Sequence, residues 1–338
     1  MGSYTQLREK VGRDGEALRR SFFVDLAEHV PLARGIFPAE ATTAPASLID
    51  ALLWLLRTSP GGSLSPATAR RLRALALDFR RFGFPASAYR DFAAAAKRAL
   101  APLAGSQADA LLNATAELMR SEAEAADAAG IPAATAARVA SVDPRGAVTL
   151  VRLEAGMGLG YQPGQYMPVM AAGRQGEWRN LAPALPANPF GQLEFHVTDE
   201  FTPQVGAYVT LGAARGPALD LYSREDLLIV AAGTGAAVAK AIVFALAQQQ
   251  DRPRTHLLLQ APSRAAHYDY QVFSALAELH GWFSLSRAPL GADIAPELWR
   301  GRRVVVSGAS TSVREIADGL RGAASLVEIA PDAPVTWD

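Results

Sequence analysis

The longest apolar run of the chain, residues 227–247, constrains its fold more than any other stretch. About 20 apolar residues are enough to cross a bilayer, so length alone is compatible with a membrane span. Lys240 argues against a span, because a lysine inside the hydrocarbon costs about 2.5–3.5 kcal/mol on insertion scales. Gly233-Thr234-Gly235 also interrupts the run after a short β-branched segment. The pattern therefore predicts a buried parallel strand, a tight glycine turn and a helix.

The turn Gly233-Thr234-Gly235 has two interpretations. A strand, a glycine turn and a helix commonly begin a nucleotide site, because glycines let backbone N–H groups approach a phosphate at the positive end of the helix. Alternatively, the small residues only let the strand and the helix pack closely. A single Gly-Thr-Gly does not decide between the two.

Composition limits the classes of partner. The 338 residues suffice for two or three domains, and with 50% hydrophobic residues each domain can bury a core. Lysine plus arginine and aspartate plus glutamate each number 33, which argues against nucleic acid and for a protein or small-molecule partner. There is no cysteine, so thiolate and disulfide chemistry is excluded, and no apolar signal segment follows Met1. We expect a cytoplasmic protein without membrane insertion.

The N-terminal part predicts an all-α domain, residues 1–135. Residues 18–130 have helical periodicity, interrupted by proline and glycine. Ser65 is a predicted N-cap with Pro66 in the first helical position. Residues 133–144 are expected to form a linker.

After Ala147 the apolar period changes to two, and turn residues separate short strands, which predicts a small antiparallel β-barrel over residues 136–224. After Glu225 strands and helices alternate, which predicts a doubly wound α/β sheet over residues 225–338. The predicted strands include 165–170, 192–197, 208–211, 227–230, 256–260, 303–307 and 326–329.

Five segments carry a resemblance to a known family. They are Ser21-Phe22-Phe23-Val24-Asp25-Leu26, Asp78-Phe79-Arg80-Arg81-Phe82-Gly83-Phe84 with Tyr89, Tyr161-Gln162-Pro163-Gly164-Gln165-Tyr166, Trp178-Arg179-Asn180-Leu181-Ala182-Pro183-Ala184 and Ala231-Ala232-Gly233-Thr234-Gly235. With the domain order, they resemble flavohaemoglobins of the actinobacterial type, in which a globin domain is fused to a ferredoxin-reductase-like FAD/NAD module. The resemblance implies a globin-like domain, an FAD-domain-like barrel and an NAD-domain-like sheet.

Haem binding is where the sequence departs most from that resemblance. It places the proximal histidine at Phe79, the distal tyrosine at Phe23 and the distal amide at Ala44. None of these side chains can hold or contact a haem ligand in the family's way. His29 is expected to be a surface or capping residue, and the spacing of Tyr89 and Met119 supports neither as an iron ligand.

The flavin motif is also incomplete. Arg179 remains where the resemblance implies a phosphate contact, but Leu181 replaces an aromatic residue and Ala182 replaces a hydroxyl. Asp199 and Glu200 would bring two carboxylates toward a diphosphate, which disfavours its binding.

The nicotinamide side is better preserved. Gly233, Thr234 and Gly235 match the family's glycine loop, whereas Ser307 replaces the cysteine that lies near a nicotinamide. Hydride transfer would also need a flavin as acceptor.

The other histidines form no recognisable site in the sequence. His196, His256 and His280 lack metal-ligand spacing, and we expect each to be structural. The segment His267-Tyr268-Asp269-Tyr270 resembles the family's strand-to-helix loop rather than a catalytic cluster.

These departures lead to three hypotheses. The first is a pseudoenzyme that has lost haem and flavin and acts as a regulatory or scaffolding protein by binding a protein partner or a nucleotide. It predicts no catalytic residue, no metal site and no cofactor; Arg179 and Gly233 to Gly235 would be vestigial or weak cofactor contacts. The second is an FAD/NAD(P)H-dependent oxidoreductase with a haem-free globin domain. The third is a nitric oxide dioxygenase, which would need a haem iron.

Overall fold

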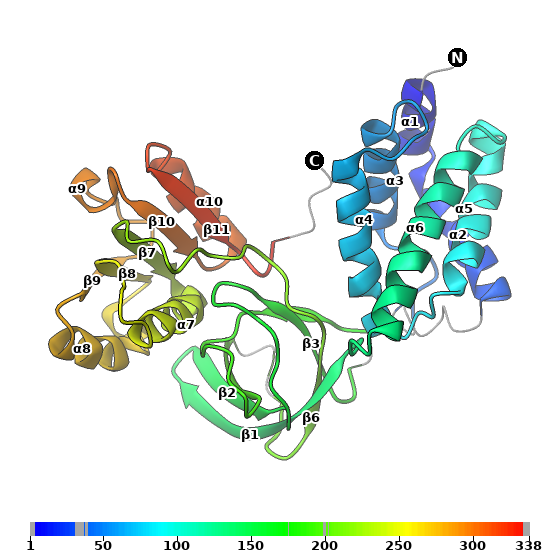
Figure 1. Cartoon of the computed structure of the whole chain (residues 1–338). Coiled ribbons are helices and arrows are strands. Elements are labelled where there is room, and N and C mark those ends of the chain that lie inside the picture. Colours follow the sequence, from blue (N-terminus) through cyan, green and yellow to red (C-terminus); the bar gives the residue numbers. More distant parts are fainter. Residues whose placement is uncertain are drawn as a thin grey trace. The chain divides into compact units, whose positions relative to one another are not determined.

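Figure 1 shows the computed structural model of the chain, which describes residues 4–30, 37, 40–174, 176–198, 201 and 203–333. These residues form a helical unit, residues 4–134, and a two-sheet unit, residues 135–173 and 178–333. None of the described helices combines the length and the apolar character that crossing a membrane requires.

The helical unit is all-α, as predicted. Its helices are α1 (Tyr4–Arg13), α2 (Gly15–His29), α3 (Ala46–Thr58), α4 (Pro66–Phe79), α5 (Ala88–Ala104) and α6 (Asp109–Ala128). The predicted N-cap is confirmed, because the Thr68 amide donates to Ser65 Oγ at 3.1 Å and Pro66 opens the helix. Such a cap contributes about 1 kcal/mol.

The first sheet of the two-sheet unit is a nearly closed antiparallel barrel. Its strands are β1 (Thr135–Arg145), β2 (Val148–Glu154), β3 (Met167–Ala171), β4 (Arg179–Leu181), β5 (Gln192–Val197) and β6 (Tyr208–Leu211), in the order β4-β3-β6-β1-β2-β5. A bridge between Pro183 and Phe195 brings the ends of the sheet together. The predicted barrel is confirmed.

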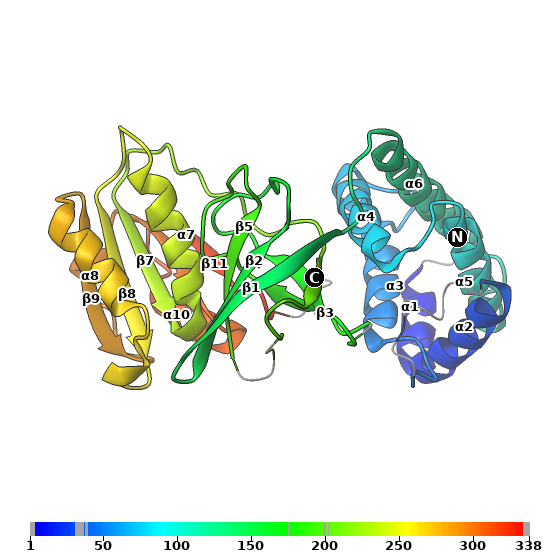
Figure 2. The ribbon, with the colours of Figure 1, turned by 90° about the horizontal axis from the view of Figure 1, so that it is seen from below.

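The second sheet is parallel and carries helices on both faces, as Figures 1 and 2 show. Its strands are β7 (Leu227–Ala232), β8 (Thr255–Ala261), β9 (Phe283–Pro289), β10 (Arg303–Ser307) and β11 (Ser325–Ile329), in the order β11-β10-β7-β8-β9. The helices are α7 (Ala236–Ala247), α8 (Tyr270–Leu279), α9 (Pro296–Trp299) and α10 (Ser310–Gly319). Residues of α7 and α8 share one core with the sheet, and residues of α10 share the other. The predicted doubly wound sheet is confirmed.

One sequence prediction about local structure is wrong, and one strand of the parallel sheet was not predicted. Residues 133–144 are not a linker, because most of them form the long strand β1, which pairs with both β2 and β6. Its only fully buried side chains are Ala137 and Val139, so the apolar alternation is too weak to reveal a strand. Strand β9 was also not predicted, because its burial is partial along most of its length.

Candidate functional site

The glycine turn lies at the carboxyl end of β7, where the strand order of the parallel sheet reverses. Strand β7 is flanked by β8 on one side and by β10 on the other, and open α/β sheets bind ligands at such a switch point. The turn Gly233–Gly235 is a short 3₁₀ segment that leads directly into α7. The predicted sequence of buried strand, tight turn and helix is confirmed.

Backbone atoms fill the space between this turn and the end of β10. A Cβ on Gly235 would overlap the Ser307 carbonyl group and would lie 2.8 Å from the Gly308 nitrogen. The buried Ser307 hydroxyl donates to the Gly235 carbonyl at 3.0 Å. Gly235 is therefore required for close packing, and the Ser307 side chain is used to hold the turn. Gly233 differs, since its φ of 56° favours glycine but no atom lies within 4 Å of its Cβ position.

A cluster of buried polar side chains lies where the barrel contacts α7 and the loop before α8. It begins on β5, where Leu193, Phe195 and Val197 point into the barrel core. Because side chains alternate along a strand, Glu194 and His196 point to the opposite face. That face is covered, because the side chains of Glu194 and His196 are only 2% and 0% exposed.

The cation of the cluster comes from α7. Lys240 Nζ lies 2.7 Å from Glu194 Oε1 and 3.2 Å from Asp269 Oδ2, the latter just before α8. Both carboxylates are buried, and Lys240 is 7% exposed. Arg152, on β2, donates from outside to Glu194 Oε2 at 2.8 Å. The two carboxylates are thus balanced by two cations.

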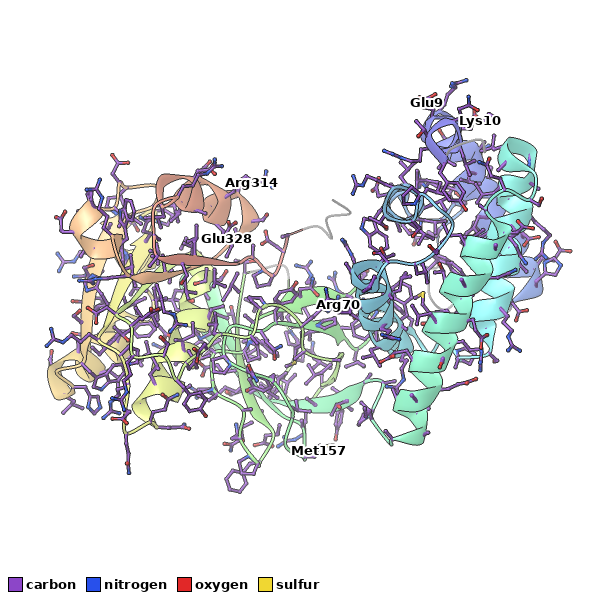
Figure 3. All side chains as sticks on the ribbon, turned by 45° about the horizontal axis from the view of Figure 1, so that its top comes forward. Glu9, Lys10, Arg70, Met157, Arg314 and Glu328 are labelled. Carbon is purple, nitrogen blue, oxygen red and sulfur yellow. The ribbon has the colours of Figure 1, made fainter. Side chains whose placement is uncertain are left out.

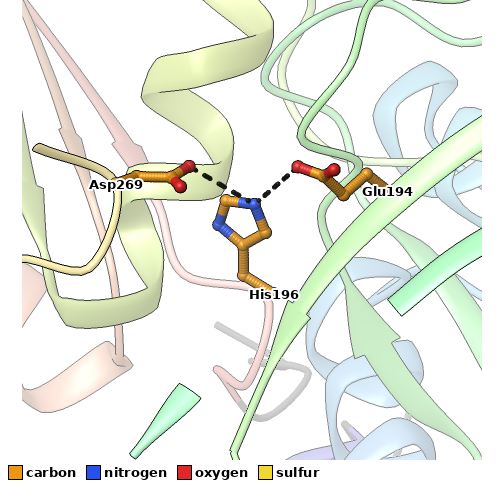
Figure 4. Close-up of side chains that lie close together, drawn as sticks. All are labelled: Glu194, His196 and Asp269. Atoms are coloured by element: carbon orange, nitrogen blue, oxygen red, sulfur yellow. Dashed lines mark hydrogen bonds and ion pairs between the residues drawn. The ribbon is translucent and has the colours of Figure 1, made fainter. Parts of the chain in front are cut away.

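His196 completes the cluster, as Figure 4 shows. Its Nε2 lies 3.0 Å from Glu194 Oε1 and 3.7 Å from Asp269 Oδ2, and its Nδ1 lies 2.8 Å from the Tyr268 hydroxyl. A carboxylate only accepts hydrogen bonds, so Nε2 donates to Glu194, and Nδ1 shares a hydrogen bond with the Tyr268 hydroxyl.

Two pKa shifts keep the cluster in this state. Burial alone raises the pKa of the Glu194 carboxyl, but hydrogen bonds from His196, Lys240 and Arg152 and the charge of Lys240 hold it well below its ordinary value. Burial, with the negative charges of Asp269 and Glu194, raises the pKa of the Tyr268 hydroxyl well above its ordinary value. Glu194 is therefore a carboxylate and Tyr268 a neutral phenol.

The donor set of Glu194, His196 and Asp269 is one that a divalent metal accepts, with ligand atoms within 4.8 Å of one another. Lys240 makes that assignment unfavourable. Its ammonium group already contacts both carboxylates, and a metal ion bound to them would be repelled by it. The arrangement is best described as a buried ionic cluster with its own cation.

Comparisons with known proteins identify the fold. No protein-family model and no curated protein matches the sequence. Among solved structures, the flavohaemoglobin of Malassezia yamatoensis with bound FAD and haem is 15% identical and superposes with a TM-score of 0.69, over 97% of this chain and 99% of that chain. The fold is flavohaemoglobin-like.

Two further structures each cover less than two thirds of this flavohaemoglobin-like chain. A ferredoxin NADP⁺ reductase from Neisseria gonorrhoeae is 14% identical, with a TM-score of 0.49 over 58% of this chain and 98% of that one. The FAD/NAD-binding domain of a nitric oxide dioxygenase from Vibrio cholerae is 18% identical, with a TM-score of 0.47 over 57% of this chain and 97% of that one.

The residues at which the resemblance implies haem contacts carry side chains without an iron-coordinating atom. Phe79, at the end of α4, is partly buried and packs against the helical core, and Ala44 is fully buried. Phe23 is in edge contact with Phe37 at 5.3 Å between ring centroids. None of the three carries an atom that coordinates iron, so these residues do not fit the group.

The other candidate iron ligands are used in the core or at the surface. The buried Tyr89 hydroxyl donates to the Ala76 carbonyl at 3.3 Å, and burial raises the pKa of this phenol well above its ordinary value. Met119 is buried in the helical core. His29 is half exposed at the end of α2 and contacts the Asp25 carbonyl. This agrees with the predicted surface or capping role.

The residues at which the resemblance implies flavin contacts lie on β4 and just after it. Arg179 is partly buried in β4, Leu181 packs against the barrel core, and Ala182 packs against the core of the parallel sheet. Arg179 could contact a phosphate, but Leu181 and Ala182 offer a flavin neither an aromatic ring nor a hydroxyl. The fit is therefore poor. Asp199 and Glu200 lie outside the described residues.

Sequence reasoning missed the ionic cluster, although two signals were present. Lys240 is a charged residue in a helix that is otherwise apolar on all sides, and a buried charge needs a partner. The alternation of β5 places two titratable side chains on one face. His256 and His280 remain outside the cluster; His256 contacts Ser284 and Ser286 hydroxyls, both at 2.8 Å, in keeping with a structural role.

Proposed function

We propose that this chain is a flavohaemoglobin-like pseudoenzyme, which has lost haem and flavin and acts as a regulatory or scaffolding protein by binding a protein or a nucleotide. The observation that carries the proposal is Phe79. It stands where the resemblance implies the proximal histidine, and its ring packs against the helical core. A phenyl ring has no lone pair for iron.

The flavin and nicotinamide positions give further support. Leu181 and Ala182 take part in packing at the barrel and at the parallel sheet. The Ser307 hydroxyl donates to the Gly235 carbonyl and is therefore committed within the fold. Changes at three cofactor positions in one chain are easier to reconcile with a binding role than with electron transfer.

Absorption spectroscopy tests the loss of cofactors. The purified chain is titrated with hemin and, separately, with FAD, and the unbound cofactor is removed by gel filtration. We expect neither cofactor to remain at a stoichiometry near one. A Soret band of ligated haem in the protein fraction would contradict the proposal, and so would a retained flavin that is reduced by NADPH.

The proposal includes binding of a protein partner. Two exposed barrel loops allow this binding to be tested by substitution. Phe190 and Met157 are 73% and 51% exposed, and Gly191 packs on the Met157 backbone, so the two loops adjoin. Figure 3 shows Met157 on the outer part of the barrel. We expect Phe190→Asp to weaken capture of a partner from lysate, whereas Tyr222→Asp, at another exposed aromatic residue, should leave it unchanged. No specific capture at physiological salt would contradict a scaffolding role.

A second candidate is an FAD/NAD(P)H-dependent oxidoreductase with a haem-free helical domain. The module fold, the retained Arg179 on β4 and the glycine turn before α7 favour it. It requires a flavin band and steady NAD(P)H oxidation, both of which the pseudoenzyme proposal excludes. The same spectroscopic titration therefore separates the two.

A further inference from the structure

The buried ionic cluster joins the barrel to the parallel sheet. Glu194 and His196 belong to β5 of the barrel, whereas Lys240 and Asp269 belong to α7 and to the loop before α8. Elsewhere in the junction the contact is apolar: Ala182, Leu219 and Leu221 pack against the core of the parallel sheet. The cluster therefore places charge inside an otherwise apolar junction.

A second contact between the barrel and the parallel sheet is tightly packed at Gly164. A Cβ on Gly164, in the loop before β3, would lie 2.7 Å from Leu219 and 3.1 Å from Ile329 at the end of β11. Gly164 also has a φ of 94°, which disfavours other residues. Barrel and sheet thus meet at two places, one apolar and tight, the other ionic and buried.

The stability of this junction depends on each charged group of the cluster, because a buried charge without its partner is costly. Complete, the cluster has two carboxylates opposed by Lys240 and Arg152, and the Lys240 ammonium bridges both acids. With Lys240 removed, Glu194 and Asp269 would remain as buried like charges, with Arg152 contacting only Glu194 and the His196 ring contacting both. Separation of the sheets would then return both carboxylates to water, which favours the open arrangement.

We propose that Lys240 links β5 of the barrel to the parallel sheet by contacting both buried carboxylates. As a result, the barrel and the parallel sheet unfold together and not independently. This inference concerns the conformational behaviour of the two-sheet unit and does not depend on the proposed function. It also explains why a charged residue occupies a helix that is otherwise apolar. The lysine supplies, from within the chain, the positive charge that the acid pair requires.

Hydrogen exchange of the full-length chain, read by mass spectrometry, tests the coupling. In the native chain we expect the slowest amides of β5 and β7 to exchange through one common opening. In Lys240→Met, which keeps the apolar stem, the β5 amides should exchange at least about tenfold faster relative to those of β7, because the barrel can leave the sheet. Arg224→Met is the matched control, since its pair with Asp251 is 78% and 77% exposed and joins no buried groups.

A second variant separates charge balance from side-chain loss. In Lys240→Met/Asp269→Asn, one acid is neutralised together with the cation, and we expect the relative exchange of β5 and β7 to return most of the way to the native value. Equal acceleration of both strands in Lys240→Met would overturn the proposal, because a general loss of stability explains it. An effect no larger than in the control would overturn it too. If Lys240→Met does not fold, Asp269→Asn alone should uncouple the strands in the same direction but less.

The other possible occupant of the cluster is a divalent cation, and the same protein tests it. Thermal unfolding of the native chain is followed with added ZnCl₂ and with EDTA. Because Lys240 already holds both carboxylates, we expect no stabilisation by zinc that depends on Glu194 or Asp269. A zinc-dependent rise in Tm that is lost in Asp269→Asn would overturn the assignment of Lys240 as the resident cation.

Discussion

The helical unit and the two-sheet unit both bury a basic side chain, but they partner it differently. Arg80, just after α4, is 6% exposed and donates to Asp127, which keeps 59% of its side chain in solvent. It also donates to the Ile131 carbonyl at 2.6 Å. Lys240 instead faces two carboxylates that are as buried as itself. Water solvates Asp127 beside Arg80, whereas the carboxylates beside Lys240 are stabilised by protein groups.

The difference teaches where electrostatics is critical in this molecule. An acid that remains hydrated loses little when its partner is removed, because water still solvates it. Two buried acids without their cation cannot be solvated without moving the structure. The cluster around Lys240 should therefore be far more sensitive to loss of one charge than the pair of Arg80 and Asp127.

The largest expected effect is that of Lys240→Met on stability. We expect the two-sheet unit to lose about 3–5 kcal/mol of unfolding free energy, the range for breaking a buried ion pair from one side. Urea unfolding followed by hydrogen exchange of the β5 amides measures it. A loss below about 1 kcal/mol, typical of exposed pairs, would remove the contrast between the two units.

Gly235→Ala is expected to come next. Its new methyl group would overlap the Ser307 carbonyl, and the turn cannot withdraw without breaking the hydrogen bond from Ser307. Overpacking of this kind costs about 1–3 kcal/mol. Gly281→Ala is the matched control, because nothing lies within 4 Å of its Cβ position. Equal unfolding free energies in the two variants would show that the glycine turn is not a packing turn.

Arg80→Met should have a smaller effect than Lys240→Met. It leaves the Ile131 carbonyl without this donor, while the exposed Asp127 remains hydrated. We expect a loss of about 1–2 kcal/mol in the helical unit, seen as faster exchange of α6 amides. Arg90→Met, at the exposed pair with Glu117, should change little. A cost equal to that of Lys240→Met would mean that partner exposure does not matter here.

The smallest expected effect concerns pH. Burial and the charge of Arg302 lower the pKa of His256, so the folded protein binds this proton less readily than the unfolded chain. The resulting stability is complete above the ordinary histidine pKa of about 6.5 and is lost as pH falls below it. By contrast, hydrogen bonding to Arg98 lowers the pKa of Asp25 in the helical unit, so its contribution is lost only below about pH 4.

Unfolding of the two units between pH 7 and pH 5 measures this difference. We expect the two-sheet unit to weaken and His256→Asn to flatten its pH dependence, because asparagine keeps hydrogen-bonding capacity without titrating. An unchanged pH slope in His256→Asn would assign the effect to another group.

The sequence predicted the fold because its patterns are local. The apolar run before Gly233 specified a buried strand, and the cap at Ser65 specified a helix start. Strand β1 escaped prediction because most of its side chains are partly buried or exposed, so neither face is uniformly apolar. An apolar pattern in the sequence reflects burial of one face of an element. An element with few buried side chains therefore has no clear pattern.

The sequence by itself determined the three successive folds and the absence of an iron ligand at Phe79, since element type and side-chain chemistry are properties of the chain. Only the tertiary structure decided what Glu194, His196, Lys240 and Asp269 do. These residues are up to 75 positions apart, and each alone resembles an ordinary surface or structural residue. Their charges interact strongly only when they are buried between the barrel and the parallel sheet, because burial removes the water that would otherwise solvate each group independently.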